Sequence, residues 1–189
     1  MNVVIIGSGG REHALALKIK ESAELKNLYI IPGNPGTRFL CENINIDSSD
    51  QTKIIEFCKA KEIDLVVIGP EQPLVEGLAN VLRENQINVF GPNKEAAQIE
   101  SSKYFAKQVM KEAGVPTAKY LAFTSNMLAP ARDYIKNKKY PCVIKADGLA
   151  AGKGVFVCNE PREAEDALNL IFHDKVFGES GEKVLVEEF

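Results

Sequence analysis

The chain contains the stretch Tyr140-Pro141-Cys142-Val143-Ile144-Lys145-Ala146-Asp147-Gly148-Leu149-Ala150-Ala151-Gly152-Lys153-Gly154-Val155-Phe156-Val157. Its two apolar runs predict strands, and the loop between them consists mostly of small residues. Backbone N–H groups can approach an anion closely where no large side chain intervenes, and glycine also accepts strained backbone angles. Lys145 and Lys153 add positive charge at the root and the tip of this loop. We therefore predict a β-loop-β phosphate cover, with a triphosphate as the anion.

The same stretch does not fit the Walker P-loop, the commoner glycine-rich phosphate motif. That motif needs G-x4-G-K-[ST], whereas Asp147 stands at the first glycine position and Gly154 replaces the hydroxyl residue. The residues that follow are strand-like, so no helix N-terminus would receive the phosphate. A glycine-rich surface hairpin without a ligand is the competing interpretation of this loop taken alone.

Bulk composition favours a globular protein that acts on small molecules. With 189 residues and 45% hydrophobic content, the chain can bury a substantial core in one large domain or two small ones. The formal net charge of −3 provides no global field for nucleic acid or an anionic membrane, so we expect neither partner. No signal peptide or run of membrane-spanning length is visible, and a cytoplasmic location is expected.

The cysteines and histidines do not form a metal motif. The four cysteines lack C-x-x-C spacing, and the only two histidines, His13 and His173, are not paired with them. Cys142 and Cys158 fall in apolar strand patterns, where cysteine behaves as a small buried hydrophobe. We predict reduced thiols and no zinc site.

The first hundred residues alternate between apolar runs and amphipathic stretches. We expect strands at residues 3–6, 28–31, 64–68 and 89–90, and helices at 12–20, around 54–58 and at 74–82. This alternation predicts a doubly wound α/β domain with right-handed crossovers.

The pattern changes near residue 100, where we place a boundary between a domain of residues 1–100 and a domain of residues 101–189. In the second domain we expect helices at 102–113, 128–138 and 161–172, and strands at 117–123, on both sides of the glycine-rich loop, and at 184–189. Pro161 suits the first turn of its helix.

Three loops of the first domain follow predicted strands: Gly7-Ser8-Gly9-Gly10-Arg11-Glu12, Pro32-Gly33-Asn34-Pro35-Gly36-Thr37 and Gly69-Pro70-Glu71-Gln72-Pro73-Leu74. In open α/β sheets ligands lie at the carboxyl ends of strands, so we predict that the three loops form one pocket. A helix N-terminus after glycines suits a phosphate or carboxylate, and Arg11 would reinforce it. Glu71 would accept hydrogen bonds from ligand hydroxyls or an amine, or it would simply be a first-turn residue of a helix.

The first loop is not a dinucleotide fingerprint. The motif G-x-G-x-x-G would need glycine at the position of Glu12, and the second strand ends at Ile31-Pro32 without an acid for a ribose hydroxyl. An NAD-dependent dehydrogenase is therefore disfavoured.

In these motifs the chain resembles the amino-terminal part of the phosphoribosylamine–glycine ligases, a family of the ATP-grasp superfamily. The matching segments are Gly7-Ser8-Gly9-Gly10-Arg11-Glu12-His13-Ala14, the second and third loops, Phe90-Gly91-Pro92, Ser102-Lys103, Ile144 to Val155 and Glu187-Glu188-Phe189. The resemblance implies an α/β pre-ATP-grasp domain followed by the first, incomplete portion of an α+β ATP-grasp domain. It also implies ATP-dependent ligation of glycine to 5-phosphoribosylamine through glycyl phosphate, a step of purine biosynthesis.

The resemblance further implies roles for individual residues. ATP contacts are implied at Lys103, Lys145, Gly148, Leu149, Ala150, Gly152, Lys153, Gly154, Glu187, Glu188 and Phe189. Contacts with phosphoribosylamine are implied at Gly9, Gly10, Arg11, Glu12, Gly33, Asn34, Gly36, Thr37, Gly69, Pro70 and Glu71. No catalytic side chain is assigned with certainty. Mg²⁺ or Mn²⁺ is implied as cofactor, with its ligands expected beyond Phe189.

Because members of the family continue well beyond Phe189, we expect this chain to be a truncated piece that does not complete the reaction alone. Two alternatives stay open: another ATP-grasp ligase or carboxylase, and a non-catalytic nucleotide-binding module. The oligomeric state is left open by the sequence.

Overall fold

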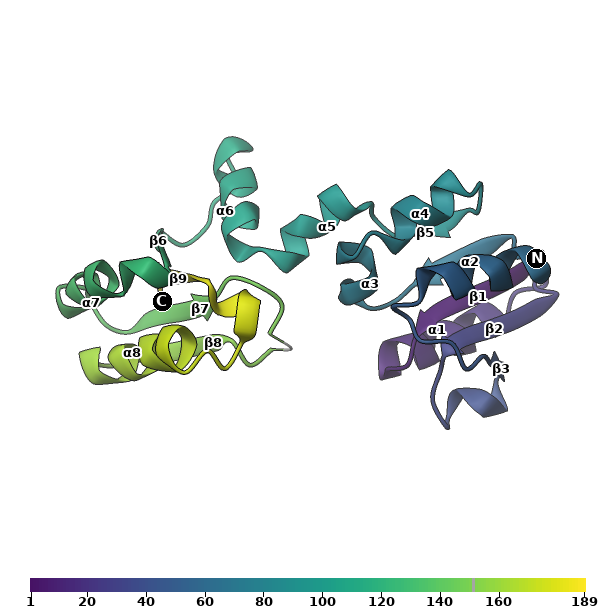
Figure 1. Cartoon of the computed structure of the whole chain (residues 1–189), viewed down its shortest axis with the longest axis horizontal. Helices are drawn as coiled ribbons and strands as arrows, with labels where there is room; N and C mark the ends of the chain where they lie inside the picture. Colours follow the sequence, from purple (N-terminus) through teal and green to yellow (C-terminus); the bar gives the residue numbers. More distant parts are fainter. Residues whose placement is uncertain (151) are drawn as a thin grey trace. The chain divides into compact units, whose positions relative to one another are not determined.

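A computed structural model of the chain describes residues 1–150 and 152–189 (Figure 1). The chain divides into two compact units, Met1–Ala97 and Gln98–Phe189, and each is described by itself.

The first unit is built on a five-stranded parallel sheet with strand order β3-β2-β1-β4-β5. The strands are β1 (Asn2–Gly7), β2 (Asn27–Pro32), β3 (Glu42–Asn43), β4 (Leu65–Ile68) and β5 (Val89–Phe90). The helices are α1 (Gly10–Lys20), α2 (Gln51–Ala60), α3 (Glu71–Val75), α4 (Leu78–Glu84) and α5 (Lys94–Ser101), and the last of these contains the division between the units.

Both faces of this sheet are covered, as the continuous apolar run of β1 predicts. Val4 and Ile6 belong to a core cluster with residues of α2 and α4, whereas Val3 and Ile5 belong to a second cluster with Ala16 of α1. A strand that buries successive side chains on opposite faces needs a helical layer on each side. The predicted doubly wound α/β fold is confirmed.

The structure differs from the expected helix at residues 74–82. Two short helices, α3 and α4, replace it, and Gly77 between them has a left-handed backbone with φ of 92°. Glycine adopts this conformation without the penalty that a Cβ atom would bring, so the chain can change direction there. The short edge strand β3 and the helix α5 were also not expected.

The second unit contains a four-stranded antiparallel sheet with strand order β6-β9-β7-β8. The strands are β6 (Tyr120–Thr124), β7 (Cys142–Ala146), β8 (Val155–Cys158) and β9 (Lys183–Glu188). The helices are α6 (Lys103–Glu112), α7 (Leu128–Lys136) and α8 (Pro161–Leu168), and α8 continues as a π-helical segment, Asn169–His173.

The two faces of this sheet differ in chemistry. One face packs Cys142, Ile144, Val184 and Val186 against α7 and α8 in a core cluster. Because side chains alternate along a strand, Lys145 of β7 and Glu187 of β9 lie on the other face. The sheet therefore places a cation and an anion on the face opposite its hydrophobic core.

Cys142 and Cys158 are buried free thiols at paired positions of β7 and β8, as their apolar surroundings predict. Burial raises the pKa of Cys158 to about 12 and that of Cys58 to about 11. No helix in the described ranges is long and apolar enough to cross a membrane.

Candidate functional site

The glycine-rich flap has the predicted strand-loop-strand arrangement. β7 and β8 pair antiparallel, with Lys145 opposite Val155, and the described residues of the connecting loop contain no helix. The loop closes through hydrogen bonds from the Lys153 N–H to the Ala150 carbonyl (2.9 Å) and from the Ala146 N–H to the Gly154 carbonyl (2.8 Å). Lys153 itself is exposed. Ala151, also part of the expected cover, lies outside the described residues.

The root of the flap is held by a close contact with Ser180. The Gly148 N–H donates to the Ser180 carbonyl (3.1 Å), and the Ser180 hydroxyl donates to the Leu149 carbonyl (2.9 Å). Lys103 Nζ donates to the carbonyls of Gly148 (3.0 Å) and Asp147 (3.2 Å). These hydrogen bonds hold the backbone at the root of the flap in one position.

Asp147 ties the flap to the N-terminus of α6. Its carboxylate accepts from the Ser102 hydroxyl (2.9 Å) and the Tyr104 N–H (2.6 Å), while the Ser102 hydroxyl caps the helix by accepting from the Phe105 N–H (3.1 Å). A carboxylate is favourable at this position because the helix N-terminus carries partial positive charge. Burial lowers the pKa of Lys103, and the charge of Asp147 opposes part of this shift.

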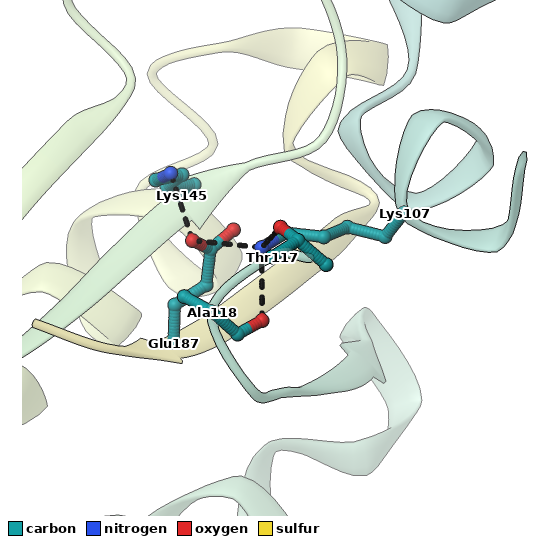
Figure 2. A network of polar contacts seen from close by, with 5 residues as sticks. All are labelled: Lys107, Thr117, Ala118, Lys145 and Glu187. Carbon is teal, nitrogen blue, oxygen red and sulfur yellow. Dashed lines mark hydrogen bonds and ion pairs between the residues drawn. The ribbon is translucent and has the colours of Figure 1, made fainter. Parts of the chain in front are cut away.

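Glu187 is the centre of a buried charge network (Figure 2). Its Oε2 atom lies 2.9 Å from Lys145 Nζ and 3.3 Å from Lys107 Nζ, and its side chain is only 4% exposed. Lys107 Nζ also donates to the Thr117 hydroxyl (2.7 Å) and the Ala118 carbonyl (3.0 Å). The Oε1 atom of Glu187 is buried and has no hydrogen-bond partner in the part of the chain that the structure describes.

The next two residues are placed differently from Glu187. Glu188 follows it on β9 and is exposed, because successive side chains of a strand point to opposite faces. The Glu188 N–H donates to the Lys119 carbonyl (3.0 Å), and the Phe189 side chain is 77% exposed. Only the first carboxylate of the pair thus joins Lys145 and Lys107.

In the first unit, Glu12 supports the loops from beneath. It is buried, and its Oε2 atom accepts from the Gly9 N–H (2.7 Å). Its side chain fills the space where a Cβ atom of Gly7 or Gly69 would lie, with its Cγ atom 2.6 Å from either position. These contacts give the Glu12 side chain a role inside the protein, and the contact with phosphoribosylamine that the resemblance implies stays a prediction.

Arg11 and Glu71 link the first and third loops. The Arg11 guanidinium donates to the Gly69 carbonyl (2.6 Å) and forms an ion pair with Glu71 (3.0 Å). Glu71 is the first residue of α3 and follows Pro70 at the N-cap position. A hydrogen bond from its own backbone N–H, and then one from Arg11, lower the pKa of Glu71. Glu71 is thus a first-turn residue of a helix, one of the two interpretations offered by the sequence. Its carboxylate is also paired with Arg11.

The second loop is held together by Asn34 and Thr37. The Asn34 side chain accepts from the N–H groups of Gly36 (2.8 Å) and Thr37 (3.1 Å) and donates to the Ser8 carbonyl (2.9 Å). Thr37 is fully buried, and its hydroxyl bonds to the Asn34 carbonyl (2.8 Å). These two side chains therefore hold the second loop in shape through hydrogen bonds within the protein.

Substituting Gly69 with alanine is expected to destabilise the first unit by about 1–3 kcal/mol, the usual cost of overpacking. The new Cβ atom would collide with the buried Glu12 side chain, whose Cγ lies 2.6 Å away. Gly10→Ala is the matched control, because a Cβ atom there meets nothing within 4 Å. Chemical denaturation measures both; equal stability of the two variants would contradict the role given to Glu12.

Three participants were not anticipated from the sequence: Lys107, Thr117 and Ser180. Lys107 lies one helical turn after Lys103, and this i, i+4 spacing was the only local signal that both lysines share a face of α6. Ser180 and Thr117 reach the site through tertiary contacts, for which the local sequence carries no signal.

Comparison with known families accounts for both units of the chain. The model of the phosphoribosylglycinamide synthetase N domain matches residues 1–100, and that of the phosphoribosylglycinamide synthetase ATP-grasp (A) domain matches residues 101–189. The chain belongs to the phosphoribosylglycinamide synthetase family. The resemblance noted in the sequence is thereby confirmed.

Curated relatives of this chain are called phosphoribosylamine–glycine ligase. The one from Mesorhizobium japonicum is 51% identical over 189 residues, and the one from Haemophilus influenzae is 46% identical over 191 residues. Each alignment takes in 100% of this chain and 44% of the relative. The chain thus spans less than half the length of the curated relatives it matches.

Solved structures agree with this family assignment. The crystal structure of phosphoribosylamine–glycine ligase from Thermotoga maritima is 35% identical with a TM-score of 0.79, over 100% of this chain and 44% of that one. N5-carboxyaminoimidazole ribonucleotide synthetase from the same organism, at 20% identity and a TM-score of 0.69 over 100% of this chain and 45% of that one, shares the fold. Among residues 1–150 and 152–189, no group of three or more His, Cys, Asp or Glu could hold a metal ion.

Proposed function

We propose that the full-length protein joins glycine to 5-phosphoribosylamine with ATP and forms glycinamide ribonucleotide, ADP and phosphate. The observation that carries this proposal is the lysine-rich face beneath the flap, where Lys145 meets the buried Glu187 and Lys103 meets the flap root. The match of both units to one family of ligases supports the choice of substrates.

The nucleotide is proposed to bind between the flap and the part of the second sheet that carries Lys145 and Glu187. Lys145 has one side-chain partner among the described residues, Glu187, so two of its three N–H donors are available for phosphate oxygens. Lys103 is likewise left with one donor beyond the two carbonyls that it contacts. The unpartnered Oε1 of Glu187 would accept from a donor group of the nucleotide, since a buried acceptor without a partner is costly.

The proposed roles within the flap follow from its backbone. Leu149, Ala150, Gly152 and Gly154 would surround the phosphates with N–H groups, while Gly148, whose N–H donates to Ser180, would hold the root of the flap beside them. The exposed Lys153 would add charge when the flap closes. Glu188 and Phe189 would contribute through the backbone of β9 and through the exposed aromatic ring, because their side chains do not join the Glu187 network.

Phosphoribosylamine is proposed to bind to the three loops of the first unit. The Gly9 N–H at the N-cap of α1 already donates to Glu12, so the N–H groups that follow it in the first turn, beginning with Gly10, would bind a phosphate, with Gly9 allowing its close approach. The backbone of Gly33, Gly36, Gly69 and Pro70 would line the rest of the site, with Arg11 and Glu71 as its charged pair. Glu12, Asn34 and Thr37 would act by holding these loops in place.

The proposed chemistry has two steps. A glycine carboxylate oxygen attacks the γ-phosphorus of ATP, so an O–P bond forms while the bond to ADP breaks. The amine of phosphoribosylamine then attacks the carbonyl carbon of glycyl phosphate; the C–N bond forms, the C–O bond breaks, and phosphate and a proton leave. Positioning and charge neutralisation supply most of the catalysis in such phosphoryl transfer.

The residues of this chain would contribute charge and protection from water. Lys103 and Lys145 would bind phosphate oxygens, and the closed flap would keep water from glycyl phosphate. A divalent cation would supply further neutralisation of the phosphates when bound. We propose that its ligands lie outside residues 1–189.

The test is an assay of ADP release by the full-length protein with ATP, Mg²⁺, glycine and phosphoribosylamine formed in place from ribose 5-phosphate and ammonia. Turnover is expected only when both glycine and phosphoribosylamine are present. Turnover with bicarbonate instead of glycine would point to an ATP-grasp carboxylase and overturn the proposal. The 189-residue chain alone is expected to give no turnover.

A further inference from the structure

Lys107 is enclosed by the protein to a degree that is unusual for a lysine. Its side chain is 10% exposed, and its ammonium group lies 5.5 Å from the centre of the Tyr120 ring. Its three contacts are the Thr117 hydroxyl (2.7 Å), the Ala118 carbonyl (3.0 Å) and Glu187 Oε2 (3.3 Å). An ammonium group has three N–H donors; two of those of Lys107 form hydrogen bonds within the protein, and its charge is paired with Glu187.

These contacts distinguish Lys107 from Lys145, the other lysine of the network (Figure 2). Lys145 keeps donors for a ligand, whereas Lys107 could contact a phosphate only by giving up a buried partner. A buried charge that loses its partner carries a large penalty. Glu187 is the charged residue that Lys107 contacts, so any effect of Lys107 on a ligand would pass through this carboxylate.

Lys107 and Lys145 share one oxygen of Glu187, so Lys107 affects the pairing between Glu187 and Lys145. Oε2 lies between Lys145 and Lys107, so one carboxylate faces two ammonium groups. If Lys107 were absent, Lys145 would be the sole counter-charge of Glu187 in this network. A Lys145 ammonium group that moved to a phosphate would then leave the Glu187 carboxylate without a counter-charge. With Lys107 in place, Glu187 keeps a counter-charge while Lys145 turns to the ligand. Lys107 also holds Oε2, which leaves Oε1 as the oxygen without a partner.

We infer that Lys107 is a positioning residue for nucleotide binding: it anchors Glu187 from α6 and thereby makes Lys145 available to the nucleotide. This inference rests on the proposed function only in taking ATP as the ligand of the second unit. It concerns the affinity for ATP and not the identity of the carboxylate or amine substrate.

The experiment is a double-mutant cycle in the full-length protein with ATP binding measured by calorimetry. The variants are Lys107→Met, Glu187→Gln and the combination of both; Lys111→Met, an exposed position on the same helix, is the matched control. Lys107→Met is expected to raise the dissociation constant of ATP about tenfold or more, consistent with the coupling seen between close charge pairs. In the Glu187→Gln background the same change is expected to have less than about a threefold effect, because Lys107 acts through the carboxylate.

Two results would overturn the inference. One is a lower melting temperature of Lys107→Met with an unchanged ATP dissociation constant, which indicates a purely structural lysine. The other is an equal loss of affinity in both backgrounds. If Lys107→Met does not fold, Thr117→Val is used instead, because it removes one hydrogen-bond acceptor of Lys107. The affinity for ATP should then fall severalfold when Glu187 is present and stay the same in the Glu187→Gln background. Unchanged affinity in both backgrounds rejects the inference.

The same binding data separate this inference from the proposed function. A wild-type protein that binds ATP but does not ligate glycine would refute the ligase proposal and leave the cycle interpretable. A protein that ligates glycine while Lys107→Met binds ATP normally would refute the inference alone.

Discussion

Replacing Lys145 with methionine in the full-length protein should lower kcat/KM for ATP by about 100-fold or more, the effect typical of removing one charged or hydrogen-bonding group from a developing phosphate or oxyanion. Lys145 is the lysine of the Glu187 network that keeps donors for a ligand. Methionine retains the length of the side chain and removes its charge. Steady-state kinetics with varied ATP at saturating glycine measure the change.

Lys139→Met is the matched control for this prediction, because Lys139 lies near β7 in the sequence and is exposed. It should have kinetic constants within about twofold of the wild type, as surface substitutions usually do. Wild-type kinetics of Lys145→Met would contradict the placement of the nucleotide beneath the flap. A parallel melting experiment shows whether the loss arises from unfolding.

Replacing Gly148 with valine should lower kcat/KM for ATP by about 10- to 100-fold, because a displacement of about 1 Å in a catalytic element has effects of this size. The new Cβ atom would lie 2.5 Å from the Ser180 hydroxyl and 2.7 Å from the Ser180 Cα atom. A flexible side chain could turn away, but a backbone atom cannot, so the root of the flap must shift. The free energy of unfolding should fall by about 1–3 kcal/mol.

Gly152→Ala provides the comparison within the same flap. A Cβ atom at Gly152 meets nothing within 4 Å, although its φ of +77° disfavours alanine. The cost should be about 1 kcal/mol, from backbone conformation alone. If Gly148→Val has no larger effect on kcat/KM than Gly152→Ala, the contact with Ser180 does not orient the flap.

Much of the fold was predictable because its determinants are local. The apolar run of Val3 to Ile6 fits only a strand buried on both faces, and the structure has helices on both sides of it. The apolar runs around residues 147–154 likewise predicted the antiparallel pair β7 and β8. The break at Gly77 was not foreseen, since an isolated glycine also occurs inside continuous helices.

The candidate site was predictable only in part, for a related reason. Residue type and loop position pointed to Lys145, and the family resemblance pointed to Glu187, but neither could show which carboxylate oxygen remains without a partner. Nor could they show that Thr37 turns inward while Arg11 stays exposed. Such distinctions depend on contacts between residues far apart in the chain, as in the pair of Lys107 and Glu187.

The interlock of Gly7, Gly69 and Glu12 restricts how the first unit can evolve. One carboxylic side chain occupies the volume that two separate loops leave empty, so a substitution at any of the three positions is expected to change the effect of substitutions at the other two. A larger residue at position 69 becomes acceptable only after position 12 has become smaller, whereas the reverse order passes through a damaged intermediate. The packing of Glu12 beneath these loops thus limits the order in which substitutions can be tolerated.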